Sequence, residues 1–450
     1  MVWLTIVSFL LTLGFILWRP RGINEAIPAT IGAIVVLLSG SVTLADLGII
    51  AETISGAAIT IMATIVMAIV LESFGFFNWV AEKLAEKANG SGIRLFWYVN
   101  LLCFLMTLFF NNDGSILITT PILVMLLNNM GLKNHQKIPY LLSGALIATA
   151  SSAPIGVSNI VNLIALKIVH MSLYLHTAMM FVPATLGLLL LTWLLFLRFK
   201  KVLPKTVPTK VTGLSLPSYH PLKPSSLKHA SEKERSRFMR NVLLFVFSVR
   251  VSLFVASFLS IPVSLMAVFG SLVLLGWRWA YLKIPPTDML KKTPWYIIVF
   301  AFSMYVIIYG LNNIGLTDWL IQFMRPMVSG SLLHASVLMG VLLSVLSNIF
   351  NNHPALMVGT LTLTNMNLDL LSLKISYLAT VIGSDMGSLL LPMGTLATLM
   401  WMHIVRKGKV MISWWQYIKI TFVVIPPATL FTLVILYYWV SWLFGGTLQR

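Results

Sequence analysis

The chain has 450 residues, of which 58% are hydrophobic and only 10% are charged. A soluble domain of this size needs more polar surface, so the composition indicates a protein that lies in a lipid bilayer. The formal net charge of +18 does not indicate nucleic-acid binding, because Lys and Arg occupy short segments between apolar runs, where they set membrane orientation. A single cysteine, Cys103, excludes an internal disulfide framework and a metal site made of several thiolates from this chain.

Apolar segments long enough to cross about 30 Å of hydrocarbon recur along the chain from Val2, which we expect to begin a retained span. Segment 95–129 is flanked by Arg94 and Lys133 and carries Asn111-Asn112-Asp113-Gly114 at its middle. Because basic residues favour the cytoplasmic side, both ends of this segment lie there. The pattern predicts a re-entrant hairpin with a polar tip.

The next run, 138–169, is interrupted by Pro154 and Gly156, which predicts a helix broken within the membrane. Segment 198–240 is rich in Pro, Ser and Lys and contains eleven Lys and Arg against two Glu. We expect it to be a poorly ordered cytoplasmic linker between two membrane units, residues 1–197 and 241–450. The same rule places the N-terminus outside, and the protein is expected in the cell membrane.

The two membrane units are related by sequence. At an offset of 240, Gly75 and Trp79 align with Gly315 and Trp319, and Phe110-Asn111-Asn112 aligns with Phe350-Asn351-Asn352. Each unit contains five spans, an odd number, so the second unit runs through the bilayer in the opposite sense. The predicted fold is therefore all-α and polytopic, with two inverted repeats of five spans, each with a re-entrant hairpin and a broken helix. A plain bundle of twelve or more complete spans is the alternative.

Polar side chains interrupt four apolar segments, at the two hairpin tips and the two helix breaks. They must face one another or water, because lipid satisfies no hydrogen bond. Each Asn, Ser or Thr either binds a solute or only joins helices, and the repetition of the Asn pairs favours binding. The candidate solute-binding residues are Asn111, Asn112, Asn351, Asn352, Ser158, Asn159 and Thr395.

Two acids, Asp113 and Asp385, are expected deep in the membrane, where an ionisable group is a functional candidate. They are candidates for carrying a coupled proton. His353 aligns with Asp113 in the repeat and shares that role or donates to a neighbouring carbonyl. We expect no metal site and no cofactor.

At these residues the chain resembles the arsenical-pump membrane protein family (ArsB), from the opening span to the last. The motifs that carry the resemblance are Trp18-Arg-Pro-Arg-Gly22, Ser73-Phe-Gly-Phe-Phe-Asn-Trp79, Asn112-Asp-Gly-Ser-Ile-Leu-Ile-Thr-Thr-Pro121, Val157-Ser-Asn-Ile-Val-Asn162, Met304-Tyr-Val-Ile-Ile-Tyr-Gly310, Asn351-Asn-His-Pro354, Ile382-Gly-Ser-Asp-Met-Gly387 and Pro392-Met-Gly-Thr-Leu-Ala-Thr398. The resemblance implies a secondary transporter that exports arsenite or antimonite with the proton gradient. In some members a soluble pump ATPase assists, and this chain has no G-x-x-x-x-G-K-[ST] loop of its own.

Three positions depart from the family pattern. Relatives usually have an acid at Thr149, a Lys at Leu389 and a Met at His353. The departures leave open a sister permease for another small anion, or a sodium/proton antiporter. Two other classes fit less well: a channel needs a continuous polar path, and an intramembrane aspartyl hydrolase needs Asp113 and Asp385 within hydrogen-bond reach.

Overall fold

The computed structural model describes residues 2–20, 23–208 and 232–444, and their regular structure is helical. The first unit contains α1 (Val2–Trp18), α2 (Ala26–Leu38), α3 (Leu44–Ser73), α4 (Phe76–Ala88), α5 (Gly92–Phe109), α6 (Asn112–Asn129), α7 (Asn134–Ala150), the short 3₁₀ helix η2 (Gly156–Ser158), α8 (Ile160–Ile168) and α9 (Leu173–Phe199). The second contains α10 (Glu232–Phe258), α11 (Val263–Leu282), α12 (Thr287–Lys292), α13 (Tyr296–Asn313), α14 (Leu316–Val328), α15 (Leu332–Phe350), α16 (Asn352–Thr364), α17 (Leu370–Asp385), η3 (Gly387–Leu390), η4 (Pro392–Gly394), α18 (Leu396–Lys407) and α19 (Trp414–Phe444). The predicted all-α fold is confirmed.

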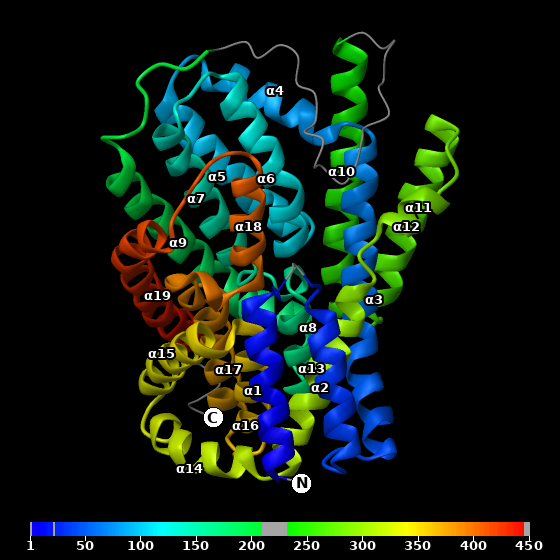
Figure 1. Cartoon of the computed structure of the whole chain (residues 1–450), viewed down its shortest axis with the longest axis vertical. Helices are drawn as coiled ribbons and strands as arrows, with labels where there is room; N and C mark the ends of the chain where they lie inside the picture. The colour runs from blue at the N-terminus through cyan, green and yellow to red at the C-terminus, as the bar shows by residue number, and fades with distance from the viewer. Residues whose placement is uncertain (1, 21–22, 209–231, 445–450) are drawn as a thin grey trace.

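Eight helices in the described residues are long and apolar enough to cross a bilayer, namely α3, α5, α9, α10, α11, α13, α15 and α19. The predicted interrupted spans consist of α7 with α8 and of α17 with α18. These half-helices have 17, 9, 16 and 12 residues, so none of them is among the eight. The first two predicted spans are also short. α2 has 13 residues, which rise about 20 Å, and the connection between α1 and α2 lies near the middle of the molecule rather than at its end (Figure 1).

The order of helices in the first unit recurs in the second, apart from the additional α12 and a second 3₁₀ helix between α17 and α18. Contacts recur as well: α2 packs on α13 as α11 packs on α3, and α6 packs on α18 as α16 packs on α8. Equivalent helices α4 and α14 lie at opposite ends of the long axis (Figure 1). These contacts support a repeat in which each hairpin packs on the broken helix of the other unit. The inverted orientation of the two units across a bilayer stays a prediction.

The aligned glycines have a structural reason. Gly75 and Gly315 lie two residues after the last residues of α3 and α13 and adopt left-handed φ angles of 74° and 88°. A side chain at Cβ disfavours this conformation, so glycine suits the sharp turn into α4 and α14. The sequence match at offset 240 therefore reports a shared turn that redirects the chain from a long helix into an amphipathic one.

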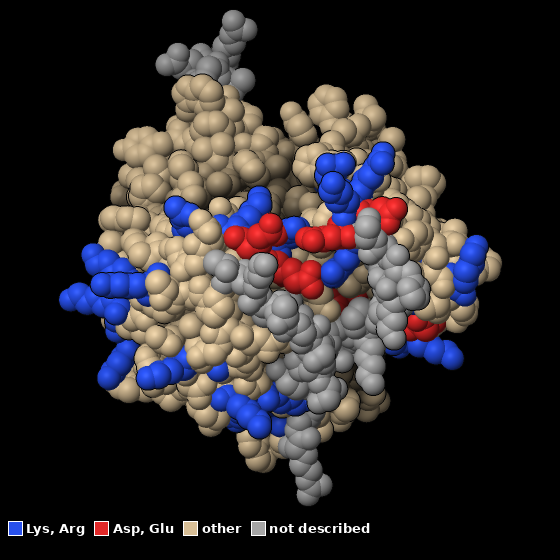
Figure 2. Space-filling view, turned by 90° about the horizontal axis from the view of Figure 1, so that it is seen from above, with Lys and Arg blue, Asp and Glu red and all other residues tan. Residues whose placement is uncertain are grey.

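The end of the molecule that carries α4 is rich in basic side chains, and acidic side chains gather near its centre (Figure 2). Two ion pairs join α4 to α10 there, Glu82 with Arg235 at 3.0 Å and Lys83 with Glu232 at 3.5 Å. Helix α10 begins at Glu232, inside the segment predicted as a linker, and α9 ends inside it at Phe199. Residues 209–231 of that segment lie outside the described residues, and its cytoplasmic position stays a prediction.

Candidate functional site

The first hairpin turns at Phe110 and Asn111, between α5 and α6. The Asn111 side chain caps α6, because its Oδ1 accepts a hydrogen bond from the Gly114 backbone N–H at 2.7 Å. A Cβ on Gly114 would come within 2.4 Å of that oxygen, so the close cap requires glycine. Asn112 Oδ1 accepts from the Asp113 N–H at 2.8 Å. Both asparagines thus order the turn that presents Asp113.

The second hairpin turns at Asn351, which adopts a left-handed φ of 72°. Its Oδ1 accepts from the His353 N–H at 3.4 Å, and its Nδ2 donates to the Met393 carbonyl at 3.1 Å. This second bond ties the hairpin to the break between α17 and α18. Asn352 Oδ1 is buried and has no hydrogen-bond partner among the described residues.

At the helix breaks, polar residues begin the two half-helices that follow. Asn159 caps α8 by accepting from the Val161 N–H at 3.1 Å, and Thr395 caps α18 by accepting from the Thr398 N–H at 3.0 Å. The Ser158 hydroxyl is buried without a hydrogen-bond partner in the described part of the chain. The candidate binding residues of both breaks therefore lie at helix N-termini, where backbone N–H groups point outward.

Asp385 ends α17 and is fully buried. Its carboxylate accepts three hydrogen bonds from the first unit: from Ser152 Oγ at 2.7 Å, Asn162 Nδ2 at 2.7 Å and Asn159 Nδ2 at 3.2 Å. These donors join the two units at the first helix break. Asp385 lines neither the small central cavity of the protein nor the larger open cavity that adjoins it.

A cavity of about 90 Å³ lies where the hairpins meet the breaks. It is lined by residues at the N-terminal starts of all four half-helices: Asp113 of α6, His353 of α16, Ile160 of α8 and Leu396 of α18. The volume corresponds to about three water molecules at roughly 30 Å³ each. Helix N-termini carry partial positive charge, so the site suits a small solute with acceptor or hydroxyl oxygens.

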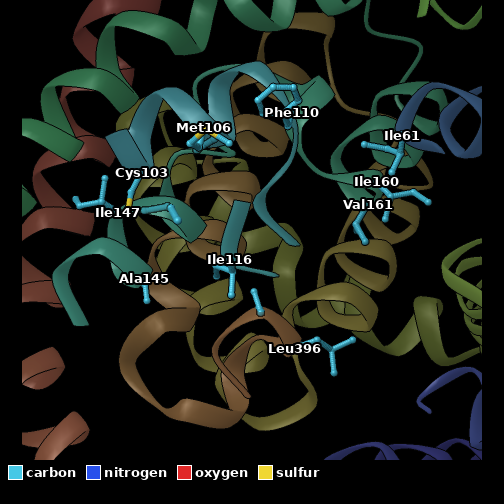
Figure 3. Packing of buried hydrophobic residues seen from close by; sticks show 14 of the residues in the cluster. Ile61, Cys103, Met106, Phe110, Ile116, Ala145, Ile147, Ile160, Val161 and Leu396 are labelled. Atoms are coloured by element: carbon cyan, nitrogen blue, oxygen red, sulfur yellow. The ribbon is translucent and has the colours of Figure 1, made fainter. Parts of the chain in front are cut away.

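Most of the remaining wall is apolar, from Ile65, Ala68 and Ile69 of α3 and Ile297 and Phe300 of α13. Figure 3 shows how the neighbouring interior is filled by apolar side chains, Phe110 at the first turn and Ile116, Ile160 and Leu396 on the half-helices. The structure thus brings Asp113 and His353 to one cavity. The predicted Asn, Ser and Thr residues are not among the residues that line it, and four of these seven cap helices. Their role in solute binding stays a prediction.

Glu25, Lys292 and Tyr296 also line the cavity and were missed by the sequence analysis. Glu25 lies at the start of α2, and Lys292 and Tyr296 flank the start of α13. In the sequence these residues lie beside apolar segments, at the ends of expected membrane spans. Charged and aromatic side chains are common there, so they gave no sign of a central position. Glu25, at the start of the short α2, lies in the wall of the central cavity, and only the 13-residue length of α2 could have signalled this.

A second, open cavity of about 540 Å³ adjoins the first. The two share Glu25, Leu117, Tyr296 and Met400 in their walls. Arg19, in the connection between α1 and α2, lines this second cavity and forms an ion pair with Glu25. His403 and Arg406 of α18 line its outer part, and α18 runs from the centre toward the end that carries α4 (Figure 1). We call this second cavity the vestibule.

Two of the three departures from the family pattern are buried and uncharged. Thr149 is 1% exposed and donates to the Ala145 carbonyl at 3.1 Å, and Leu389 is fully buried in η3. Neither side chain carries a charge that would need a partner. The third, His353, lines the central cavity, so this departure alters the wall of the site itself.

The repeated helices, the paired breaks and the central cavity define a polytopic membrane transporter. The chain belongs to the arsenical pump membrane protein family (ArsB), whose model matches residues 4–440. A protein of Bacillus subtilis (strain 168) named "Putative arsenical pump membrane protein" is 60% identical over 97% of this chain and 100% of its own length. Arsenical pump membrane proteins of Escherichia coli and Yersinia enterocolitica are each 30% identical over 95% of this chain and 96% of theirs.

A solved structure has the same general fold. The YdaH transporter of Alcanivorax borkumensis, described as having an unusual topology, superposes with a TM-score of 0.55 over 87% of each chain. The sequence identity is 14%, so this likeness concerns the fold alone.

Proposed function

We propose that this transporter exports arsenite and antimonite across the cell membrane, with the proton gradient as the driving force. Membership of the arsenical pump family is the observation that carries the proposal. Arsenite at neutral pH is an uncharged trihydroxide, small enough to be compatible with a cavity of about 90 Å³. The tip residues Asn111 and Asn351 support this site, because they cap the helices that present Asp113 and His353.

The chemistry of the wall supports hydrogen bonding to hydroxyl groups rather than capture by thiolates. Cys103 is buried and does not line the central cavity. The Asp113 carboxylate accepts hydrogen bonds from a trihydroxide, and the His353 ring offers Nδ1, which is buried without a partner among the described residues. Reversible hydrogen bonds allow release on the far side, which a three-thiolate complex with trivalent arsenic would hinder.

The proposed route leads from the cytoplasm through the vestibule to the central cavity. Arg406 and the basic residues at the same end of the molecule favour the cytoplasmic side for the vestibule mouth. Asp113 lies at the inner end of this route. A proton that binds Asp113 from outside and leaves it toward the cytoplasm would drive solute in the opposite direction.

Uptake of arsenite into everted membrane vesicles tests the proposal. With an imposed pH gradient, acid inside, we expect accumulation without ATP, and collapse of the gradient should abolish it. If arsenite accumulates only when ATP and a soluble pump ATPase are added, the energy for transport comes from that partner and not from the proton gradient. No arsenite movement under either condition would contradict the substrate assignment.

The change at His353 favours one alternative, a sister permease for another small anion. A histidine in the cavity wall binds anions when protonated, whereas the methionine usual in relatives does not. Competition in the same vesicles distinguishes the two: an anion that blocks uptake of labelled arsenite at lower concentration than arsenite itself would identify the other solute. Sodium in place of the pH gradient tests a sodium-coupled exchange.

A further inference from the structure

Arg250 carries a basic side chain into the apolar interior. It belongs to α10, one of the helices long enough to cross a bilayer, and is 3% exposed. A charged side chain at membrane depth is unfavourable and is retained where it has a specific partner or role. Arg250 is not part of either cavity wall, so its role must be found in its contacts.

The guanidinium of Arg250 holds the end of α5. Its Nε donates to the Phe109 carbonyl and its Nη2 to the Phe110 carbonyl. These carbonyls lack helical N–H partners, because Phe110 leaves the helix with φ −121° and ψ −98°. A positive charge at a helix C-terminus is also favoured by the helix dipole. Arg250 therefore terminates α5 at the hairpin turn.

The same turn presents Asp113 to the central cavity. Phe110 is bonded to Arg250, Asn111 caps α6, and Asp113 stands in the first turn of α6. Only two residues separate the carbonyl held by Arg250 from the acid in the cavity wall. The second unit thus fixes the hairpin of the first at the point where the solute is proposed to bind.

The second hairpin is held differently. In the equivalent place, Phe9 of α1 contacts the ring of Phe350 with centroids 6.1 Å apart. Phe9 of α1 and Arg250 of α10 are 241 residues apart, close to the 240 that separate Phe110 and Phe350, so the two contacts come from the equivalent helices of the two units. The hairpin that carries Asp113 is therefore held by a cation, Arg250, and the hairpin that carries His353 is contacted by an aromatic ring, Phe9.

We propose that Arg250 is a positioning residue for transport, which holds the end of α5 and thereby sets the place of Asp113 in the central cavity. This inference rests on the proposed function for its consequence in transport. Its structural part, the fixation of the first hairpin, can be tested without any solute.

The test compares Arg250→Met and Arg250→Lys with a matched control, Arg278→Met. Arg278 of α11 is also buried, at 2% exposure, but it bonds Asp288 and Ser73, which do not line the central cavity. All variants carry Cys103→Ser, and those used for labelling also carry Leu117→Cys, so that their only thiol is on α6 in the wall shared by the two cavities. The KM is measured without Leu117→Cys, because a thiol in that wall would itself bind trivalent arsenic. Two quantities are measured on the folded fraction: the KM for arsenite, and the rate at which an impermeant thiol reagent labels Leu117→Cys.

Arg250→Met is expected to raise the KM about tenfold and to change the labelling rate to a similar extent, as the loss of charge-assisted hydrogen bonds implies. Arg250→Lys keeps the charge and one donor and should fall between Arg250→Met and the unsubstituted protein. Arg278→Met should leave both quantities unchanged.

Two outcomes would overturn the proposal: effects of Arg278→Met equal to those of Arg250→Met, or a folded Arg250→Met with an unchanged KM and an unchanged labelling rate. If Arg250→Met does not fold, Arg250→Lys decides by the same two criteria. If the unsubstituted protein moves no arsenite, the proposed function fails while the labelling rates still decide the role of Arg250.

Discussion

Asp113 and Asp385 are both acids of the protein interior, but their carboxylates have different surroundings. Asp113 faces a cavity that adjoins an open vestibule, whereas Asp385 accepts hydrogen bonds from three donors of the other unit. An acid that exchanges protons needs access to water, and an acid that joins two units needs fixed donors. The contrast assigns the proposed proton to Asp113 and a joining role to Asp385.

Asp113→Asn tests the first assignment, because asparagine keeps the shape of the side chain and removes its titration. We expect transport driven by a pH gradient to collapse, while exchange of labelled solute without a gradient persists at least in part. Uptake by everted vesicles with and without the gradient measures both. If Asp113→Asn keeps an unchanged pH dependence and Asp385→Asn does not, the proton belongs to Asp385 instead.

Asp385→Asn tests the second assignment through stability. The substituted amide turns an N–H₂ group toward the donors Ser152, Asn159 and Asn162, so at least one buried donor loses its acceptor. The loss should destabilise the protein by about 2 kcal/mol or more. Thermal unfolding of the purified protein in detergent measures this, with Asp113→Asn as the control. Equal Tm values for the two variants would mean that Asp385 does not join the units.

At the scale of helices, two glycine turns redirect the chain from α3 into α4 and from α13 into α14. Gly75→Ala and Gly315→Ala each place a Cβ at a left-handed φ, which costs about 1–2 kcal/mol. Gly276→Ala is the control, because Gly276 lies within α11 and a Cβ there meets no atom within 4 Å. We expect the control to be neutral or stabilising and the two turn variants to lower the Tm. Two turn variants with the Tm of the control would contradict a need for glycine.

The start of α17 gives a prediction about pH. Asp369 caps this helix outside the membrane segments, and hydrogen bonds from the Ser372 side chain and backbone lower its pKa from the usual 3.8. A lowered folded pKa means that the cap stabilises the protein above the unfolded pKa and that this stability is lost as pH falls through the folded pKa. Asp369→Ala should therefore destabilise by about 1 kcal/mol at pH 7. The Tm difference should shrink toward the most acid pH the protein tolerates, and a constant difference would exclude the charge as its cause.

At the scale of the whole molecule, the sequence indicated the fold class, both hairpin turns and both helix breaks. It did so because Asn-Asn pairs are rare in apolar segments, and because Pro and Gly two residues apart in such a segment disfavour a continuous helix. Arg250, Glu25 and Lys292 were not predicted as parts of the centre, since charges beside or within a span are ordinarily assigned to loops or interfaces. The position of Glu25 depends on the short length of α2, which the sequence does signal. The positions of Arg250 and Lys292 depend on which helices pack together, and local sequence does not encode this.

The vestibule and the central cavity share part of their walls. Glu25 and Tyr296 line both cavities, and the Arg19–Glu25 ion pair stands at this boundary. Breaking the pair should loosen the connection between α1 and α2 and admit reagents to the inner cavity more often. We therefore expect Arg19 and Glu25 to restrict entry from the vestibule.

Thiol labelling in a Cys103→Ser background measures this restriction. Ala68→Cys lies only in the inner cavity and His403→Cys only in the vestibule. Glu25→Gln should accelerate labelling of Ala68→Cys by up to about fivefold, as the loss of an ion pair of ~1 kcal/mol implies, and leave His403→Cys unchanged. The exchanged pair, Arg19→Glu with Glu25→Arg, should restore slow labelling of Ala68→Cys. Acceleration at both thiols would indicate a general loosening of the protein, and no acceleration at Ala68→Cys would show that the pair does not restrict entry.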